Sequence, residues 1–140
     1  MDSTSLTDRD IGEWSEFSRS SERSLLIRLP SSPGVYVVLF ERLQERCFGA
    51  SDVAYIGKAT NKNGLRGRVR QYFHPGPTQS TNIAMKERLW EPSCSLRLGF
   101  TVSASEVDAE CLESELLILF ESEHGELPPF NRQRALRSMS

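Results

Sequence analysis

One stretch of the sequence decides the fold: Tyr55-Ile-Gly-Lys-Ala-Thr-Asn-Lys-Asn-Gly-Leu-Arg-Gly-Arg-Val-Arg-Gln-Tyr-Phe73. Its first residues end an apolar run that begins at Val53, and Gly57 leads into a short polar loop. Beyond the loop, apolar residues recur at helical spacing. These residues are Leu65, Val69, Tyr72 and Phe73. The stretch therefore predicts a strand, a loop and a short helix that faces the core.

The same stretch carries a concentrated positive charge. Five Lys or Arg residues and no Asp or Glu lie between Val53 and Ala84, whereas the whole chain has a net charge of −2 and a pI near 5.7. Arg offers planar pairs of hydrogen-bond donors to phosphate oxygens. A chain with an acidic net charge, however, is not expected to bind nucleic acid strongly and non-specifically. We therefore predict a local site for a phosphate-bearing partner. The alternative is a solvated helix face.

Length and composition define the class of protein. A chain of 140 residues predicts one domain with its own core. No apolar run is long enough to span a membrane, and residues 1–13 contain no signal-peptide core. We therefore expect a cytoplasmic protein, or a nuclear one in a eukaryote, with no membrane contact. The widely spaced Cys47, Cys94 and Cys111 predict reduced, mostly packed thiols, with neither a disulfide nor a zinc site.

Short elements of both kinds follow one another along the chain. Apolar or alternating runs predict strands at Val35–Phe40, Ala54–Gly57 and Ser95–Val102. Helical spacing and end signals predict helices at Leu65–Phe73, Ile83–Trp90 and Glu106–Ser122. The predicted fold class is α+β (mixed α/β), a small three-stranded, mainly antiparallel sheet flanked by helices.

Breaks in this pattern divide the chain into three parts. Residues 1–29 carry Ile11, Trp14 and Phe17 at helical spacing. We interpret them as an N-terminal helical extension that packs on the domain, on a protein partner or in a homodimer. The breaker Pro30-Ser-Ser-Pro-Gly34 begins the main domain, residues 30–131. Residues 132–140 are expected to be a flexible tail.

Polar side chains gather where these elements meet. Tyr36 and Tyr55 stand on strands that we expect to be neighbours, about 4.8 Å apart, so their phenols can share one site. Arg68 follows in the basic helix. Glu113 borders the buried stripe of the last helix, and carboxylates are rarely buried without a partner or a metal. A lone Glu facing Arg and Tyr side chains suits Mg²⁺, which keeps several water ligands.

Five short motifs, in this order, resemble those of the GIY-YIG nuclease family. They are Pro33-Gly-Val-Tyr36, Tyr55-Ile-Gly-Lys-Ala59, Leu65-Arg-Gly-Arg-Val-Arg-Gln-Tyr-Phe73, Cys111-Leu-Glu-Ser-Glu-Leu-Leu117 and Pro129-Phe-Asn131. The resemblance covers residues 29–131. It implies a metal-dependent endonuclease that hydrolyses DNA phosphodiester bonds, for example in DNA repair, with one Mg²⁺ and with Mn²⁺ as the alternative metal. The alternative function is a catalytically silent DNA-binding or protein-interaction module with the same fold.

The resemblance also implies roles for single residues. The implied catalytic residues are Tyr36, Tyr55, Lys58, Arg68 and Glu113. Glu113 would be the metal ligand. We assign Tyr36 as the general base, aided by nearby cations, and Tyr55 and Lys58 as groups that orient water and phosphate. The link from Tyr55 to the helix is longer than the family pattern, so Arg66 remains the alternative to Arg68.

The remaining polar residues of the motifs and their loops are expected to contact nucleic acid. These residues are Lys58, Lys62, Arg66, Arg70, His74 and Asn131. His74 precedes a Pro-Gly-Pro turn, where the alternative is a solvent-exposed loop histidine. The resemblance implies that Asn131 closes the site.

Overall fold

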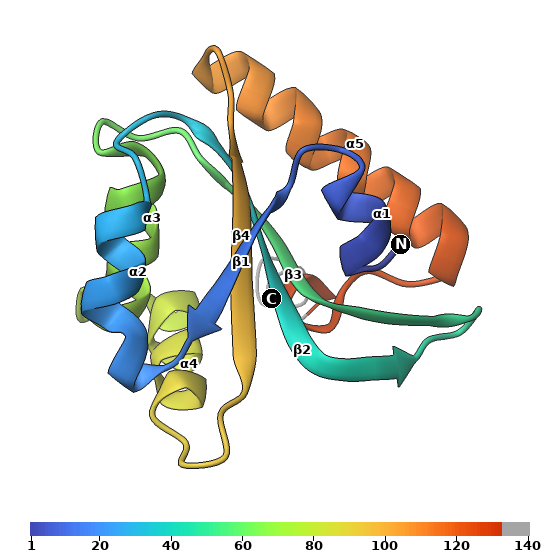
Figure 1. The fold of residues 1–140 in the computed structure, drawn as a ribbon, viewed down its shortest axis with the longest axis horizontal. Helices are drawn as coiled ribbons and strands as arrows, with labels where there is room; N and C mark the ends of the chain where they lie inside the picture. Colours follow the sequence, from blue (N-terminus) through green and yellow to red (C-terminus); the bar gives the residue numbers. More distant parts are fainter. Residues whose placement is uncertain (133–140) are drawn as a thin grey trace.

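The computed structural model describes residues 1–132, and its centre is an antiparallel sheet with helices on both faces (Figure 1). The strands are β1 (Gly12–Phe17), β2 (Gly34–Glu45), β3 (Ala50–Ala59) and β4 (Leu96–Val102). The helical elements are α1 (Ser3–Thr7), the 3-10 turn η1 (Arg19–Ser21), α2 (Glu22–Arg28), α3 (Gly64–Phe73), α4 (Ser80–Leu89) and α5 (Glu106–His124). The predicted α+β class is confirmed, with four strands rather than three. The expected tail, apart from Arg132, lies outside the described residues.

Strand β2 carries the first motif and pairs directly with β3, which carries the second. The strand order is β1-β4-β2-β3, so β2 pairs with β4 on one side and with β3 on the other, and β3 is an edge strand. In the β2–β3 register Tyr36 stands opposite Gly57, and Val38 stands opposite Tyr55. Residues opposite each other share a face of the sheet, as do residues two apart. Tyr36 and Tyr55 therefore point to the same side.

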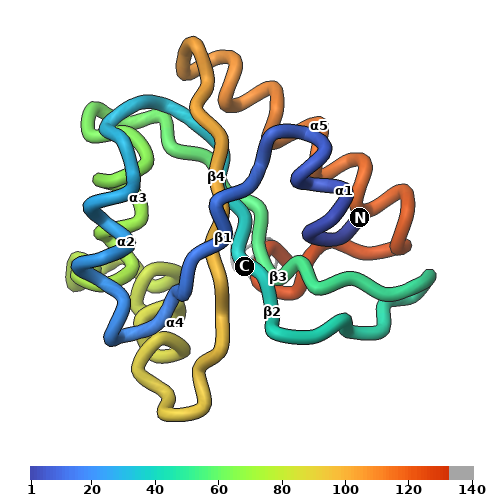
Figure 2. The backbone as a smooth tube through the Cα atoms, in the orientation of Figure 1, coloured from blue at the N-terminus to red at the C-terminus, as the bar shows by residue number. Residues whose placement is uncertain are grey.

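Alternate residues of the strands contribute to two cores. Helices α2, α3 and α4 cover one face of the sheet, and α1 and α5 cover the other, as the tube in Figure 2 shows. Tyr36 packs in the first core with Leu65 of α3. Val37 packs in the second core with Leu116 of α5. The buried side chains of β2 and β3 therefore lie on either the α3 face or the α5 face, and this decides which of the motif residues can meet.

One or two short helices were expected between residues 11 and 29, and this expectation is wrong for residues 12–17. Residues 12–17 form strand β1, which pairs with β4, and within this segment the α-helix is limited to Glu22–Arg28. The β1–β4 pairing is interrupted by a bulge. Trp14 lies against Gly99 on the α5 side, while Phe17 enters the core on the α3 side. Because the bulge breaks the strand period of two, Ile11 and Trp14 pack on the same face although they are three residues apart, and this spacing imitates that of a helix.

The prediction that the thiols are mostly packed is also wrong. All three cysteines are free, but Cys47 and Cys111 are exposed, and Cys94 is only partly buried. Cys47 Sγ donates a hydrogen bond to Glu126 Oε2 at 2.7 Å. This bond to a carboxylate, with a smaller contribution from burial, raises the pKa of the Cys47 thiol and so disfavours the reactive thiolate.

A membrane span was neither expected nor found in the part of the chain that the structure describes. Helix α5 spans 19 residues. Neither it nor any other described helix combines the length and the apolar character that a bilayer crossing needs.

Candidate active site

Three phenols meet on the face of the sheet that α3 covers. Tyr36 comes from β2, Tyr55 from β3 and Tyr72 from α3, and each side chain is at most 1% exposed. The ring centroids are 6.0 Å apart for Tyr36 and Tyr55, and the Tyr72 centroid lies 6.0 and 6.5 Å from these two. The hydroxyls of Tyr36 and Tyr72 share a hydrogen bond of 2.5 Å. The two predicted phenols do meet, together with a third that we had not predicted.

A glycine makes room for this cluster. A Cβ atom at Gly57 would lie 2.5 Å from Tyr36 Cζ and 2.6 Å from Tyr55 Cε1. These separations are too short for non-bonded carbon atoms, which pack at about 3.5–4.0 Å. The absence of a side chain opposite Tyr36 therefore leaves the space that both rings occupy.

Arg68 covers the edge of the phenol cluster. Its guanidinium carbon lies 4.5 Å from the centroid of the Tyr72 ring. Its Nη1 donates to Gln71 Oε1 at 3.1 Å and to Asn82 Oδ1 at 2.9 Å. Burial alone would lower the pKa of the Arg68 guanidinium, but attraction by the surrounding phenols outweighs burial and raises it. Arg68 therefore remains a cation although it is only partly exposed.

The protonation state of Tyr72 follows from the same surroundings. Burial, reinforced by the neighbouring Tyr36 and Tyr55, raises the pKa of Tyr72 well above its ordinary value. Arg68 lowers it, but by less. Tyr72 therefore keeps its proton at neutral pH and can donate it in the hydrogen bond to Tyr36.

Two side-chain amides, of Asn82 on α4 and Gln79 just before it, link Arg68 to α4 through hydrogen bonds. Asn82 is 6% exposed, accepts the Arg68 hydrogen bond and donates through Nδ2 to Gln79 Oε1 at 3.0 Å. The backbone N–H of Gly76 donates to the same Gln79 oxygen at 2.7 Å. A buried polar side chain costs free energy unless it is hydrogen-bonded. The orientation of the guanidinium is thus coupled to α4 and to the loop before it.

The predicted metal ligand lies in a second group of charges. Lys58 Nζ is 3.2 Å from Glu110 Oε1 and 3.9 Å from Glu113 Oε1. Glu113 is 9% exposed, whereas Glu110 is exposed. Because Lys58 follows Gly57 directly, its side chain leaves β3 on the opposite face from Tyr55, the face that α5 covers. The predicted catalytic residues are thus divided between two faces at one end of β3.

The donors at Glu113 fit a single hard cation. Mg²⁺ is commonly held by one or two carboxylates and keeps several waters. Within residues 1–132, no three His, Cys, Asp or Glu side chains are placed together as a metal site. A divalent cation at Glu113 would therefore take most of its oxygen ligands from water and substrate.

Asn131 binds the edge of β3. Its Oδ1 accepts from Ile56 N–H at 2.8 Å, and its Nδ2 donates to Ile56 C=O at 2.8 Å. Asn131 is 7% exposed, and both polar atoms of its side-chain amide are hydrogen-bonded to the backbone of β3. An edge strand otherwise leaves such backbone groups unpaired. Asn131 therefore occupies the open edge of β3 at the residue between Tyr55 and Gly57.

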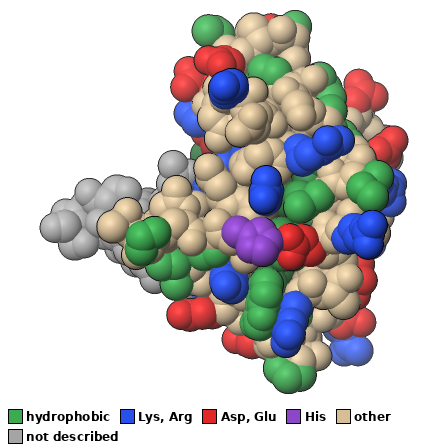
Figure 3. Space-filling model, turned by 90° about the vertical axis from the view of Figure 1, so that its left-hand side faces the viewer, with side chains coloured by type: hydrophobic (Ala, Val, Ile, Leu, Met, Phe, Trp, Pro, Cys, Tyr) green, Lys and Arg blue, Asp and Glu red, His purple; other side chains and the backbone are tan. Residues whose placement is uncertain are grey.

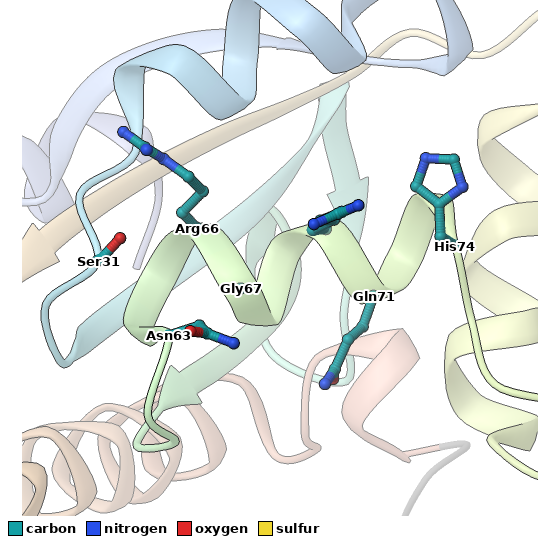
Figure 4. Close-up of a pocket in the computed structure, with 7 residues that line it drawn as sticks. Ser31, Asn63, Arg66, Gly67, Gln71 and His74 are labelled. Carbon is teal, nitrogen blue, oxygen red and sulfur yellow. The ribbon is translucent and has the colours of Figure 1, made fainter.

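The residues on and beside α3 that are expected to contact phosphates form a separate stripe on the surface. Lys62, Arg66, Arg70 and His74 recur every four residues, and all are exposed. Arg66, Arg70 and His74 line one cavity of about 460 Å³ on the outer side of the helix (Figure 4). Arg68 is two residues from Arg66 and so about 200° away around the helix. The geometry therefore places Arg68, and not Arg66, beside the phenols.

Sequence reasoning missed Tyr72, Gln71 and Asn82. Tyr72 was assigned to the core because its spacing from Leu65 and Val69 is that of a buried helix face, and it does lie in that core. The contact of Tyr72 with the site could have been inferred from its position one helical turn after Arg68. Asn82 carried no such signal, because its contact with Arg68 is made across two helices.

Sequence comparison finds relatives among UvrABC system protein C chains. The chain is 36% identical over 96 residues to the protein of Anaeromyxobacter dehalogenans, a match that covers 68% of this chain and 11% of the relative. It is 36% identical over 92 residues to the protein of Caldicellulosiruptor saccharolyticus, which covers 66% of this chain and 13% of the relative. The matches span only these small shares of the relatives' own length. The resemblance stated from the motifs is confirmed.

Solved structures and family models complete the comparison. The GIY-YIG N-terminal endonuclease domain of UvrC from Thermotoga maritima, a point mutant bound to its catalytic divalent cation, aligns with a TM-score of 0.48 and 23% identity. This alignment covers 79% of this chain and 93% of that chain. No family model matches the sequence.

Proposed function

We propose that this chain, which is similar to the nuclease module of UvrABC system protein C, is a metal-dependent endonuclease that hydrolyses DNA phosphodiester bonds. One observation carries the proposal: the hydrogen-bonded pair of Tyr36 and Tyr72 lies beside the guanidinium of Arg68. This arrangement offers a proton acceptor next to a fixed positive charge. Hydrolysis of a phosphodiester needs both, because a water must lose a proton while negative charge grows on the phosphate.

Arg68 would bind the oxygens of the scissile phosphate. Its orientation is preset by Gln71 and Asn82, which both accept from Nη1. A donor fixed in advance costs no reorganisation when charge develops.

Tyr36 would accept the proton of the attacking water. Tyr72 supports this role because it keeps its own proton and can donate to the Tyr36 oxygen, and a hydrogen bond of that kind favours a phenolate. The Tyr36 side chain is 0% exposed. DNA binding must therefore shift part of the surrounding structure before a water reaches this hydroxyl.

Lys58 and Glu113 would act from the other face of β3. Glu113 is the residue we assign as the ligand of a divalent cation, Mg²⁺ or alternatively Mn²⁺. Such a cation would offset negative charge on the phosphate oxygens when bound. Lys58, 3.9 Å from Glu113 Oε1, would hold a phosphate oxygen or a water near that carboxylate. Tyr55, whose ring centroid lies 6.0 Å from that of Tyr36, would orient water and phosphate beside it.

The remaining predicted residues would bind and position the DNA. Exposure of Lys62, Arg66, Arg70 and His74 supports phosphate contacts by these side chains. The two bonds of Asn131 to Ile56 support a positioning role for this residue instead of a direct DNA contact. We propose on the same basis that the protein acts in the cytoplasm, or in the nucleus of a eukaryote.

A panel of nicked, flapped, branched and fully paired DNA, incubated with Mg²⁺ or with a chelator, tests the proposal. We expect metal-dependent cleavage of at least one substrate. Tyr36→Phe should lower the cleavage rate by roughly 10²–10⁴-fold, the range for loss of a general base. Tyr55→Phe should cost less, because its role is orientation. Equal and small effects of both changes would show that neither phenol is the base.

A second candidate function is a DNA-binding module without cleavage activity. The observation that favours it is the burial of all three phenols, which leaves their hydroxyls covered in the DNA-free chain. This candidate predicts DNA binding that survives Tyr36→Phe and Glu113→Gln unchanged, with no product from any member of the panel under either metal.

A further inference from the structure

Two cavities on the outer face of α2 and α3 share one residue, Arg66. The first is the cavity of Arg66, Arg70 and His74 described above. The second, of about 590 Å³, is lined by Arg66 together with Arg19 and Arg23 of the N-terminal segment. Figure 3 shows this face of the molecule, where several Lys and Arg side chains lie around a histidine and the acidic side chain beside it. We call Arg19, Arg23, Arg66 and Arg70 the α2–α3 basic surface.

The guanidinium groups of this surface have no carboxylate partners within residues 1–132. Four arginines elsewhere in the described chain pair with glutamates. These pairs are Arg9–Glu115, Arg28–Glu13, Arg46–Glu126 and Arg132–Glu126. The acid beside the surface, Glu22, contacts His74 instead, at 2.5 Å. Like charges that lack counter-charges repel each other, and a partner with a row of phosphates would neutralise them.

Arg66 is held in a fixed orientation between the two cavities. Its Nε donates to the carbonyl of Leu29 at 2.8 Å, which uses one of the five guanidinium donors. Figure 4 shows the Arg66 and His74 side chains extending to the same side of α3, toward α2. A guanidinium anchored through one nitrogen keeps its remaining donors for phosphate oxygens.

The N-terminus of α3 does not supply this anion site. The N–H groups of Leu65 and Arg66 bond to the carbonyls of Ser32 and Pro30 at 2.9 and 3.0 Å. Helix-terminal N–H groups bind anions only when they are not already used. Side-chain cations must therefore carry any binding at this face.

We propose that the α2–α3 basic surface binds a stretch of DNA backbone other than the one that carries the scissile phosphate. Arg68 points about 200° away from Arg66 around α3, so one phosphate cannot meet both guanidinium groups. Arg19 and Arg23 lie outside the motifs and extend the surface beyond α3. The surface would thus orient the substrate while Arg68 acts on the cleaved bond. The identity of the partner as DNA rests on the proposed function.

The test measures binding of the full chain to a labelled DNA duplex, with a chelator present so that cleavage plays no part. Arg23→Ala and Arg70→Ala, alone and combined, probe the two cavities. Arg42→Ala is the matched control, because it removes the same charge from an exposed residue near the end of β2. In Figure 1 that end of β2 lies away from α2 and α3.

Each change in the surface should remove one phosphate contact. The slope of log K against log salt should then become shallower by about 0.9, which corresponds to about eightfold weaker binding at about 0.1 M salt. Arg42→Ala should leave both the slope and the affinity near those of the unchanged chain. In the presence of Mg²⁺, the Arg23→Ala and Arg70→Ala chains should show a larger rise in KM than fall in kcat.

Two results would overturn the inference. The first is an equal loss of affinity with Arg42→Ala, which would indicate a general effect of net charge. The second is unchanged DNA binding by the Arg23→Ala and Arg70→Ala double variant, whether or not its binding to anionic vesicles falls. If the variants behave as expected but no substrate is cleaved, the inference stands and the nuclease proposal fails.

Discussion

Arg68 differs from its neighbours on α3 in what its guanidinium contacts. It lies over the Tyr72 ring and bonds to Asn82, while Arg66 bonds to a backbone carbonyl on the outer side of the helix. Arg68→Lys keeps the charge and loses the planar fork that holds these contacts. We expect cleavage to fall by roughly 10²–10³-fold, as for loss of a transition-state donor, with DNA affinity within a few fold.

Arg66→Lys is the control for this change. It should alter the cleavage rate at saturating DNA much less than Arg68→Lys, because Arg66 lies away from the phenols. Single-turnover cleavage with excess protein measures the two rates. A larger loss from Arg66→Lys would show that the alternative register of the basic helix is the functional one.

Glu113 is the buried member of the carboxylates near Lys58. Glu113→Gln keeps the size of the side chain and removes the charge that a divalent cation needs, so we expect Mg²⁺-dependent cleavage to be abolished. DNA binding and the thermal midpoint should stay close to those of the unchanged chain. Calorimetric titration with Mn²⁺ provides a readout that does not depend on activity, and its heat of binding should disappear.

Glu115→Gln is the matched control for Glu113→Gln. The Glu115 side chain is 63% exposed and pairs with Arg9 at 3.5 Å on the outer side of α5. A surface pair of this kind contributes little to stability, so cleavage and metal binding should both persist. Normal cleavage by Glu113→Gln would remove this carboxylate from the mechanism.

At the scale of an element, the β2–β3 pair depends on Gly57. Gly57→Ala would force a methyl group against the rings of Tyr36 and Tyr55, at 2.5–2.6 Å. Overpacking of this kind costs roughly 1–3 kcal/mol, so the urea midpoint should fall. Gly12→Ala in β1 is the control, since nothing lies within 4 Å of a Cβ atom there. Equal effects of the two changes would contradict the role of Gly57.

The free edge of β3 depends on Asn131. Asn131→Ala leaves the N–H and C=O of Ile56 without their side-chain partners, at a cost of roughly 1–3 kcal/mol. The measurement is hydrogen exchange at the Ile56 amide, which should become faster than that of Val53 on the same strand. Unchanged exchange at Ile56 would mean that the side chain of Asn131 does not protect the edge of β3.

At the scale of the whole molecule, residues 1–29 are part of the domain core. Phe17, Leu25 and Leu29 are 0–2% exposed, and β1 pairs along β4. Deletion of residues 1–29 should therefore abolish cooperative unfolding, whereas a detachable extension would leave it intact. Circular dichroism during urea unfolding distinguishes the two outcomes.

A pair of point changes tests the same conclusion without deletion. Phe17→Ala should destabilise the chain by about 3–5 kcal/mol, the usual cost of removing a buried aromatic ring. Ile27 lies in the same segment but is 70% exposed, so Ile27→Ala should change stability by less than about 0.5 kcal/mol. Similar small effects would show that the N-terminal segment packs only loosely.

The sequence alone was enough for the parts of the fold that depend on local pattern. The apolar run at Val35–Phe40 and the helical spacing at Leu65–Phe73 lie within the observed elements of those types, and the alternation at Ser95–Val102 begins one residue before β4. It was not enough for residues 12–17, because a bulge shifts the strand period and gives apolar residues helical spacing. Pattern therefore predicts regular elements and fails where backbone geometry is irregular.

The sequence also predicted that Tyr36, Tyr55 and Arg68 lie close together, because neighbouring strands and the helix that follows them must be close in space. Only the tertiary structure decided which face of the sheet each side chain takes. Gly57 and Lys58 are adjacent, so the Lys58 side chain lies on the α5 face while the phenols lie on the α3 face. The contact of Asn82 with Arg68 likewise depends on how α4 packs beside α3, which no spacing along the chain encodes. Local periodicity thus determines the elements, while the packing of elements distant in sequence determines which polar atoms meet.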